Sequence, residues 1–356
     1  MSKIHTLKVA DIRRETADTV SVLMDIPENL KEEFSYKQGQ YITFVKDFNG
    51  EELRRPYSIC EAPSSGEVRV AIKQIEDGRF STYANQTLQI GDTLDVMPPM
   101  GNFTTNVHQA NENRYIFFAV GSGITPIISN IKTILEVEEN SRVVLLYGNR
   151  NSDSIIFKEE IEDLKNKYLN RFEIYFVLSR DIDTPVSLRG RIDVDKCETF
   201  EKISPLKGAD GYYLCGPEDM ILSVSDWIEK SGTERSKIHF ELFSTGKKTE
   251  AKAEESKAQL ATGNALVDVI IDGETVQFEL DKSGTNIMDA ALDAGADVPF
   301  ACKGGVCCTC RAKVIEGEVK MEVNYALQPD EVESGFVLSC QSHPITDRVV
   351  LDFDEF

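Results

Sequence analysis

Residues 301–314, ACKGGVCCTCRAKV, decide the fold of the C-terminal part of this chain. Cys302, Cys307 and Cys310 follow one another there as C-x4-C-x2-C, and a fourth cysteine, Cys340, stands alone in LSCQ. Cysteine thiolates hold a [2Fe–2S] cluster with this spacing. The segment therefore predicts an iron–sulfur cluster held by these four cysteines.

The loop that carries the first three cysteines has to wrap a compact, negatively charged core and aim backbone N–H groups at its sulfurs. Gly304 and Gly305 are expected to permit this close approach by adopting positive φ. Cys308 falls outside the spacing, so we expect it not to be a ligand. A structural zinc site is an alternative, although such sites usually combine two C-x2-C pairs and this segment has a single pair.

A disulfide framework is a second alternative. The N-terminus, MSKIHTLKVADIRRE, lacks the apolar segment of a secretory signal, and no apolar run in the chain is long enough to cross a membrane. We therefore expect a cytoplasmic protein with reduced thiols and no membrane insertion.

Length and charge bear on the number of domains and on the kind of partner. The chain has 356 residues, enough for two or three domains, and its formal net charge of -21 argues against binding to nucleic acid. From Leu266 to the end, 18 Asp and Glu residues stand against 6 Lys and Arg residues. This excess either keeps the surface hydrated or steers the region toward a partner with a basic patch.

The hydrophobic pattern divides the chain into three domains and a linker. Residues 1–108 contain short alternating runs separated by glycine and proline, which are typical of an antiparallel β-barrel. Residues 109–244 alternate continuously apolar strands with helices, which indicates a doubly wound α/β fold with a parallel sheet. Residues 245–264 are rich in Lys, Glu, Ala and Ser and predict a hydrated linker. Residues 265–356 contain a hairpin at Asp272-Gly273, a helix and then the cysteine loop.

Two segments of the first domain suit a flavin. RRPYSIC carries Arg55, Tyr57 and Ser58 on a predicted strand. They supply a cation for a pyrophosphate, an aromatic face for the isoalloxazine and a hydrogen-bonding group near its nitrogens. GRFST, residues 78–82, places backbone amides where a loop meets a short helix, as an anion site requires. Taken alone, either segment is more often an ordinary strand or turn.

Two strand–loop–helix segments of the second domain suit a nucleotide. AVGSGITP places Gly121 and Gly123 against a pyrophosphate and Pro126 in the first helical turn, although the third glycine of the common dinucleotide fingerprint is absent. YLCGPEDM repeats the arrangement around Cys215 and Gly216. Both loops are expected at the carboxyl edge of the sheet, where nucleotides bind. By itself, Cys215 would be interpreted as a small buried apolar residue.

The motifs RxYS, GxxS, GSGITP and CGP, followed by the spaced cysteines, resemble the ferredoxin–NADP reductase superfamily over nearly the whole chain. With a plant-type ferredoxin domain at the C-terminus, the chain is most similar to the oxygenase-reductase branch. Within that branch it resembles above all the reductase subunits of phenylacetyl-CoA epoxidase complexes, which act in phenylacetate degradation. The resemblance implies a flavin-binding barrel, a nucleotide-binding α/β domain and a ferredoxin domain of the α+β, β-grasp type.

In the first domain the resemblance implies an FAD site, with FMN as an open alternative. Arg55 would hold the flavin pyrophosphate, Tyr57 would stack on the isoalloxazine, and Ser58 would form a hydrogen bond near N5. The flavin phosphates would be capped by the backbone amides of Gly78, Arg79, Phe80 and Ser81.

In the second domain the resemblance implies an NADPH site, with NADH possible. Gly121, Gly123 and Thr125 would line the nicotinamide nucleotide, and Cys215 with Gly216 would lie near the nicotinamide ring.

The Ser179-Arg180 pair follows a predicted strand and matches the pair that grips the 2′-phosphate of NADPH in related enzymes. A hydroxyl and a guanidinium at the end of a strand suit a phosphate monoester. A solvated turn is the alternative.

The segment HFELF resembles the C-terminus of simpler reductases, which end with an acidic residue and an aromatic one. Glu241 would then lie near the hydride-transfer site, so that Ser58, Cys215 and Glu241 make up the predicted catalytic set. Phe243 would cover the flavin, although in this chain the sequence continues past it.

The implied activity is electron transfer from NADPH through FAD and the [2Fe–2S] cluster to an oxygenase component, expected to be a multi-subunit di-iron protein. NADPH gives up two electrons as a hydride, whereas the cluster accepts them singly, so a flavin belongs between them. A reductase of the same build could instead serve a Rieske oxygenase, a steroid hydroxylase or a membrane desaturase. An alternative of another class is a non-catalytic metal-binding module on a degenerate flavoprotein scaffold.

Overall fold

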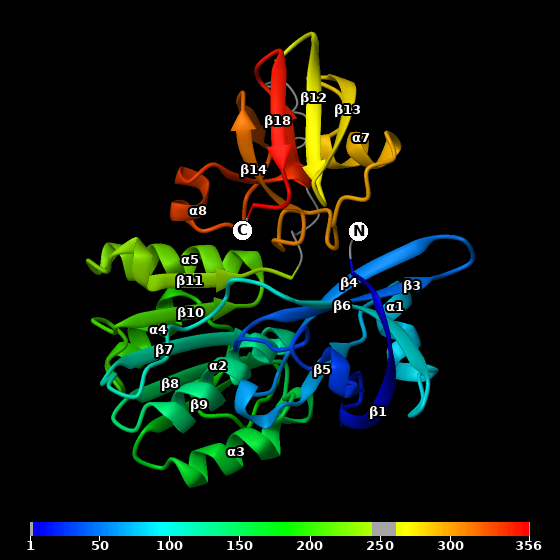
Figure 1. Ribbon diagram of the computed structural model, residues 1–356. Coiled ribbons are helices and arrows are strands. Elements are labelled where there is room, and N and C mark those ends of the chain that lie inside the picture. The colour runs from blue at the N-terminus through cyan, green and yellow to red at the C-terminus, as the bar shows by residue number, and fades with distance from the viewer. Residues whose placement is uncertain (1–2, 244–260, 356) are drawn as a thin grey trace.

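The computed structural model describes residues 3–243 and 261–355, which form three large sheets with their helices and one two-stranded sheet (Figure 1). Short 3-10 helices lie in the connections at η1 (Glu28–Leu30), η2 (Pro63–Ser65), η3 (Gly121–Gly123), η4 (Ser152–Ser154), η5 (Val186–Leu188), η6 (Arg235–Lys237) and η7 (Ser339–Gln341).

Six antiparallel strands form the first sheet, in the order β4-β3-β6-β1-β2-β5. A bridge between Ile59 and Val70 joins the two edges of the sheet, which therefore closes into a barrel. The alternating apolar residues fill its core, and Val9, Val22 and Phe44 are fully buried there. The elements are β1 (His5–Thr16), β2 (Thr19–Asp25), β3 (Tyr41–Asp47), β4 (Glu52–Ser58), β5 (Val68–Lys73), α1 (Arg79–Gln86) and β6 (Thr93–Met100).

Five parallel strands form the second sheet, in the order β11-β10-β7-β8-β9. Its strands are almost continuously apolar because α2 and α3 cover one face while α4 and α5 cover the other (Figure 1). The strand order reverses between β7 and β10, and ligands of such sheets bind at this point, beyond the carboxyl ends of the strands. The elements are β7 (Arg114–Val120), α2 (Ile124–Val137), β8 (Arg142–Asn149), α3 (Lys158–Lys167), β9 (Phe172–Leu178), α4 (Val194–Glu201), β10 (Gly211–Cys215), α5 (Glu218–Lys230) and β11 (Ile238–Glu241).

The third sheet has the order β13-β12-β18-β14-β16 and is mixed, because β12 and β18 run parallel while the other neighbours are antiparallel. The hairpin turns at Asp272 and Gly273, both with positive φ, as the sequence predicted. The elements are β12 (Asn264–Ile271), β13 (Glu274–Asp281), α7 (Ile287–Asp293), β14 (Arg311–Glu316), β15 (Val319–Met321), α8 (Pro329–Glu333), β16 (Phe336–Leu338), β17 (Ser342–Pro344) and β18 (Arg348–Asp352).

The predicted fold class is confirmed: a barrel, a doubly wound parallel sheet and a β-grasp domain follow one another. The exact domain limits stay predictions, since the boundary at residues 108 and 109 falls between the end of β6 and the start of β7. Most of the predicted linker, residues 245–264, lies outside the described residues. Within the described ranges, no helix is both long and apolar enough to span a membrane.

The third domain packs directly on the other two (Figure 1). Tyr41 of β3 lies among the core residues of the third domain. In the opposite direction, Val306 of the cysteine loop packs against the core around α4 and α5. Tyr325 donates a hydrogen bond of 3.1 Å to Glu218 at the start of α5. The cysteine loop therefore lies where all three domains meet.

Candidate functional site: a junction of three domains

The two nucleotide-type loops meet at the carboxyl edge of the parallel sheet. Gly123, in the loop after β7, lies against the end of β10. A Cβ at this position would lie 2.2 Å from the Cys215 carbonyl oxygen. Only glycine permits this approach. Gly121 has a φ of +56°, and the Thr125 hydroxyl donates to the backbone at Ser122, which closes the turn. The structure therefore brings Gly121, Gly123 and Cys215 together as predicted.

Cys215 and Glu241 are direct neighbours in the parallel register of β10 and β11. Cys215 is fully buried, and this burial raises the pKa of its thiol well above the usual range. The thiol is therefore neutral and apolar in character. Its place at the edge of the sheet agrees both with a contact to a nicotinamide ring and with ordinary packing.

Glu241 reaches from the parallel sheet to the barrel. The Ser58 hydroxyl donates to a Glu241 carboxylate oxygen at 3.3 Å. Burial raises the pKa of Glu241 to about 8, and the hydrogen bond from Ser58 offsets only part of this effect. Near neutral pH the carboxyl group is therefore largely protonated and has a proton to donate.

Residues of β4 predicted for the flavin lie beside an aromatic cluster. The Tyr57 ring packs against Phe44 and Phe80, with ring centroids 5.9 Å and 5.7 Å apart, and is half-buried. Arg55 is exposed, and one N–H of its guanidinium donates to the Arg54 carbonyl at 2.8 Å. Ser58 is 3% exposed. A supported aromatic face and an exposed cation thus lie on the same short strand.

The N-terminus of α1 follows the turn at Gly78. A Cβ there would lie 2.3 Å from the Ser81 hydroxyl oxygen, so a side chain at position 78 would close the turn. The Ser81 hydroxyl donates to the Gly78 carbonyl and accepts from the Ile75 N–H, so it shapes the loop. Arg79 is exposed and pairs with Glu51. The first backbone N–H groups of α1 point out of the helix end, as an anion site requires.

Ser179 and Arg180 lie together beyond the end of β9, and both are exposed. The Arg180 backbone N–H donates to the Arg150 carbonyl at 2.8 Å, which places two exposed arginines side by side at the carboxyl ends of β8 and β9. Arg150 was missed by the sequence analysis because nothing in the local pattern shows that these two strands are adjacent.

The four predicted cluster ligands form two pairs. Cys302 lies beside Cys307, and Cys310 lies beside Cys340. The neighbouring Cys307 thiol lowers the pKa of Cys302 to about 6, and the neighbouring Cys310 thiol lowers the pKa of Cys340. In the described part of the chain, no three His, Cys, Asp or Glu side chains gather as the ligands of one metal ion would. Two pairs suit a two-iron cluster better than a single zinc ion.

The backbone of the cysteine loop corrects one prediction. Positive φ occurs at Lys303, with +53°, and at Gly305, with +74°, but not at Gly304. A Cβ at Gly304 would contact only the Cys302 carbonyl, at 3.7 Å, whereas one at Gly305 would lie 2.9 Å from Val323. Gly305 is therefore the glycine that the loop needs. The Gly304 N–H still points at the Cys302 sulfur, 3.3 Å away, as an N–H around a cluster should.

The Cys308 side chain contacts the barrel. Its sulfur lies 3.6 Å from the Tyr41 hydroxyl oxygen, and its burial raises the pKa of the thiol to about 11. This arrangement agrees with the expectation that Cys308 is not a ligand.

A small cavity of about 40 Å³ lies between the predicted flavin contacts and the cysteine loop. Ser58 and Glu241 line one side of it, and Cys307 lines another. Phe243, which is 44% exposed, also borders this cavity. Predicted residues from all three domains therefore share a single cavity.

The comparisons with known proteins agree with this geometry. Three family models match successive parts of the chain: the oxidoreductase FAD-binding domain over residues 6–105, the oxidoreductase NAD-binding domain over residues 117–226, and the 2Fe-2S iron-sulfur cluster binding domain over residues 269–344. Over 355 residues the chain is 40% identical to one of the subunits of the 1,2-phenylacetyl-CoA epoxidase of Escherichia coli, with 99% of each chain covered. The chain belongs to the ferredoxin reductase family.

Two further proteins similar to this ferredoxin reductase were found. Over 359 residues it is 32% identical to the ferredoxin reductase component of 3-ketosteroid-9-alpha-monooxygenase from Rhodococcus rhodochrous, covering 99% of this chain and 97% of that one. The solved structure of phthalate dioxygenase reductase covers 98% of both chains with a TM-score of 0.58 and has the same fold at 23% identity. The predicted oxidoreductase with FAD-binding, NAD-binding and [2Fe–2S] domains is thereby confirmed.

Two contacts that join the domains of this ferredoxin reductase were missed by the sequence analysis. Arg54, which is 8% exposed, stacks over Phe300 of the third domain with its guanidinium carbon 4.1 Å from the ring centre. Lys132 of α2, which is 6% exposed, binds Glu61 of the barrel at 2.7 Å and Glu160 of α3 at 2.5 Å. The available signals in the sequence were the doublet Arg54-Arg55 and a lysine inside an apolar helix. Neither signal identifies the residue that the side chain contacts.

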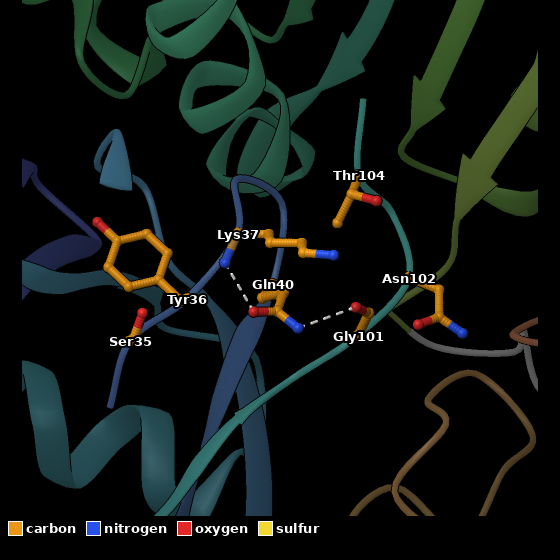
Figure 2. A pocket seen from close by; sticks show the side chains of 7 residues that line it. All are labelled: Ser35, Tyr36, Lys37, Gln40, Gly101, Asn102 and Thr104. Carbon is orange, nitrogen blue, oxygen red and sulfur yellow. Dashed lines mark hydrogen bonds between the residues drawn. The ribbon is translucent and has the colours of Figure 1, made fainter. Parts of the chain in front are cut away.

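A larger groove of about 300 Å³ opens beside the connection between the barrel and the parallel sheet (Figure 2). None of the predicted site residues lines it. Gln40 accepts from the Lys37 N–H at 2.8 Å and donates to the Gly101 carbonyl at 3.2 Å, which ties the two sides of the groove together (Figure 2). In this ferredoxin reductase, the predicted chemistry thus lies at the smaller cavity.

Proposed function

We propose that this ferredoxin reductase takes electrons from NADPH and passes them one at a time to an oxygenase component. We propose further that this component is a multi-subunit di-iron protein of a phenylacetyl-CoA epoxidase-type complex. The observation that carries the proposal is the cavity shared by Ser58, Glu241 and Cys307. It brings a flavin contact, a contact for hydride transfer and a cluster ligand within one small space. The name of the Escherichia coli relative supports this choice of partner.

The residues of the barrel fit an FAD. Tyr57 offers a ring face supported by Phe80, Arg55 presents an exposed cation to a pyrophosphate, and the turn at Gly78 opens onto the N-terminus of α1. When bound, FAD accepts a hydride from the nicotinamide and releases the electrons one at a time to a [2Fe–2S] cluster. The two cysteine pairs fit that cluster.

We infer distinct tasks for the residues at the junction. The protonated Glu241 offers a hydrogen bond toward a ring nitrogen without placing a negative charge there, and Ser58 orients Glu241 by donating its hydroxyl proton to it. Cys215 fills the edge of the sheet with an apolar group. Leu242 is 1% exposed and borders the same cavity, so it helps to keep water out.

We further propose that Ser179 and Arg180 select NADPH over NADH, with Arg150 as a second cation beside them. The acidic excess from Leu266 to the end supports docking of the third domain to a basic patch on the oxygenase. None of the eight cysteines, all of which lie in the described residues, forms a disulfide, which supports a reducing, cytoplasmic location.

The test separates hydride transfer from single-electron transfer. The full-length Cys310→Ser variant should lose its cluster yet still reduce ferricyanide with NADPH, because that reaction uses only the first two domains. It should fail to support the epoxidase oxygenase. A chain that ends at Thr245 should behave in the same way.

Three results would contradict the proposal. The first is a Cys310→Ser variant that lacks a cluster and still drives the epoxidase at the wild-type rate. The second is wild-type protein that supports the oxygenase of a 3-ketosteroid monooxygenase much better than the epoxidase, which would favour the partner of the other relative. A colourless wild-type protein after anaerobic purification would indicate a non-catalytic module instead.

A further inference from the structure

One buried hydroxyl group of the barrel reaches the cysteine loop. Tyr41 is the first residue of β3, yet its side chain is 4% exposed and packs within the third domain. Its hydroxyl oxygen lies 2.9 Å from the Thr309 hydroxyl oxygen and 3.6 Å from the Cys308 sulfur. Thr309 is 1% exposed, so the contact is shielded from water.

Thr309 stands in the sequence between two predicted cluster ligands, Cys307 and Cys310. Its contact with Tyr41 therefore holds the segment of the loop that carries both ligands. The backbone N–H groups around a cluster and the exposure of the cluster to solvent help to set its reduction potential. A shift of this segment would therefore act on the cluster as well as on the loop.

The barrel holds Tyr41 in place from its own side. Tyr41 is the direct partner of Ser58 in the antiparallel register of β3 and β4, so the two side chains stand on the same face. Gly101 has a φ of +122°, and a Cβ there would lie 3.0 Å from the Tyr41 ring, so the glycine leaves room for the ring. The hydrogen bond from Gln40 to the Gly101 carbonyl holds this segment beside Tyr41 (Figure 2).

We propose that Tyr41 is a positioning residue that couples the flavin-binding barrel to the cysteine loop by holding Thr309 between the predicted ligands Cys307 and Cys310. Its consequence for electron transfer rests on the proposed path from flavin to cluster. The coupling itself requires only the chain's own residues, since each contact in it joins two groups of the protein.

The test removes the Tyr41 hydroxyl in the full-length holoprotein and follows the loop directly. In Tyr41→Phe, amide hydrogen exchange across residues 301–314 should be about two- to tenfold faster, the range expected for one net hydrogen bond. The cluster's midpoint potential, followed by EPR, should shift, because the position of the loop around the sulfurs helps to set it. Reduction of the flavin by NADPH should keep its wild-type rate, while the rate of cluster reduction should change with the potential.

Variants of Thr309 show whether the same contact is responsible. Thr309→Val should reproduce the changes of Tyr41→Phe, whereas Thr309→Ser keeps the hydroxyl and should restore wild-type behaviour. The double variant Tyr41→Phe/Thr309→Val should exchange no faster than Thr309→Val alone, because both substitutions break one contact.

Tyr36→Phe is the matched control, because the Tyr36 hydroxyl bonds the Ala62 and Glu67 carbonyls within the barrel, at 3.0 Å and 2.8 Å. It should leave loop exchange and cluster potential unchanged. Wild-type exchange and potential in Tyr41→Phe, or equal changes in Tyr36→Phe, would overturn the proposal. If the proposed function fails instead, the wild type will not support the oxygenase, yet the differences in exchange and potential will persist.

Discussion

Ser58 of the barrel and Glu241 of the parallel sheet, 183 positions apart in the chain, lie 3.3 Å from each other through the serine hydroxyl and a carboxylate oxygen. Cys215 is the neighbour of Glu241 in the sheet, and Tyr41 is the neighbour of Ser58 in the barrel. The pair thus connects the residues proposed to meet the nicotinamide with those that reach the cysteine loop. The protonation state of Glu241 governs the charge at the centre of the junction.

Stability of the flavin-free protein should depend on the pH through Glu241. Its folded-state pKa of about 8 lies above the ordinary value of 4.5, so the folded state holds the proton more tightly. The stabilisation is complete below the ordinary pKa of 4.5 and is lost as the pH rises through the folded-state pKa of about 8. Over this range the free energy of unfolding should fall by at most about 1.4 kcal/mol per pH unit. In urea unfolding across this range, Glu241→Gln should have a flatter profile than the wild type. Glu234→Gln, at an exposed position, should keep the wild-type slope.

Gly123→Ala should impair nucleotide binding as well as stability. The added methyl group would lie 2.2 Å from the Cys215 carbonyl oxygen, so the loop must move, at a cost of roughly 1–3 kcal/mol. KM for NADPH should rise together with this loss. Gly208→Ala is the control, since Gly208 has a φ of +72° in open space far from the site. It should lose about 1–2 kcal/mol through backbone strain and keep its KM. An unchanged KM in Gly123→Ala would show that the close packing of Gly123 on the Cys215 carbonyl is not needed for nucleotide binding.

Local patterns were sufficient to predict the barrel and the parallel sheet, while the family resemblance implied the third sheet. The cysteine spacing is set by the geometry of the cluster itself, and the Asp272-Gly273 turn needs positive φ at both residues, which this dipeptide supplies. The carboxyl edge of the parallel sheet was predicted because strand–loop–helix units place their loops on one side. Each of these inferences depends on residues close together in the sequence.

Contacts between domains could not be predicted in this way. Tyr41 and Thr309 are 268 positions apart, and an aromatic residue at the start of a barrel strand ordinarily packs within its own barrel. The positive φ at Lys303 was missed because glycine is the usual residue there, whereas the loop sets this backbone conformation through tertiary contacts. Local sequence propensity describes one segment at a time, whereas the junction is formed by segments of three domains.

Arg180→Ala should change the choice of nucleotide. If Arg180 binds the 2′-phosphate, its loss removes a charge-assisted contact of about 1.5–3 kcal/mol, so KM for NADPH should rise roughly ten- to a hundredfold. KM for NADH should hardly change. Arg142→Ala, an exposed arginine at the opposite end of β8, should leave both constants as they are. An equal rise for both nucleotides would indicate that Arg180 has a structural role instead.

Lys132→Met should weaken the attachment of the barrel to the parallel sheet. The buried ammonium group also donates to the Cys60 carbonyl at 2.9 Å, and its loss leaves Glu61 and Glu160 without their cation. Breaking a buried ion pair costs about 3–5 kcal/mol, measured here by urea unfolding. Arg235→Ala breaks an exposed pair with Glu229 and should cost less than about 1 kcal/mol. Similar losses of unfolding free energy in both variants would mean that Lys132 does not hold the barrel and the parallel sheet together.

Serine substitution of each of the five cysteines of the third domain should separate the cluster ligands from Cys308. Serine in place of any member of the pairs Cys302–Cys307 and Cys310–Cys340 should abolish the visible absorption of the cluster and the iron content of anaerobically purified protein, because thiolates hold the cluster. Cys308→Ser should retain both, since Cys308 falls outside the ligand spacing and its sulfur contacts Tyr41. Flavin content should stay the same in all five variants, which separates cluster loss from misfolding of the barrel. Loss of iron in Cys308→Ser alone would show that the assignment of ligands is wrong.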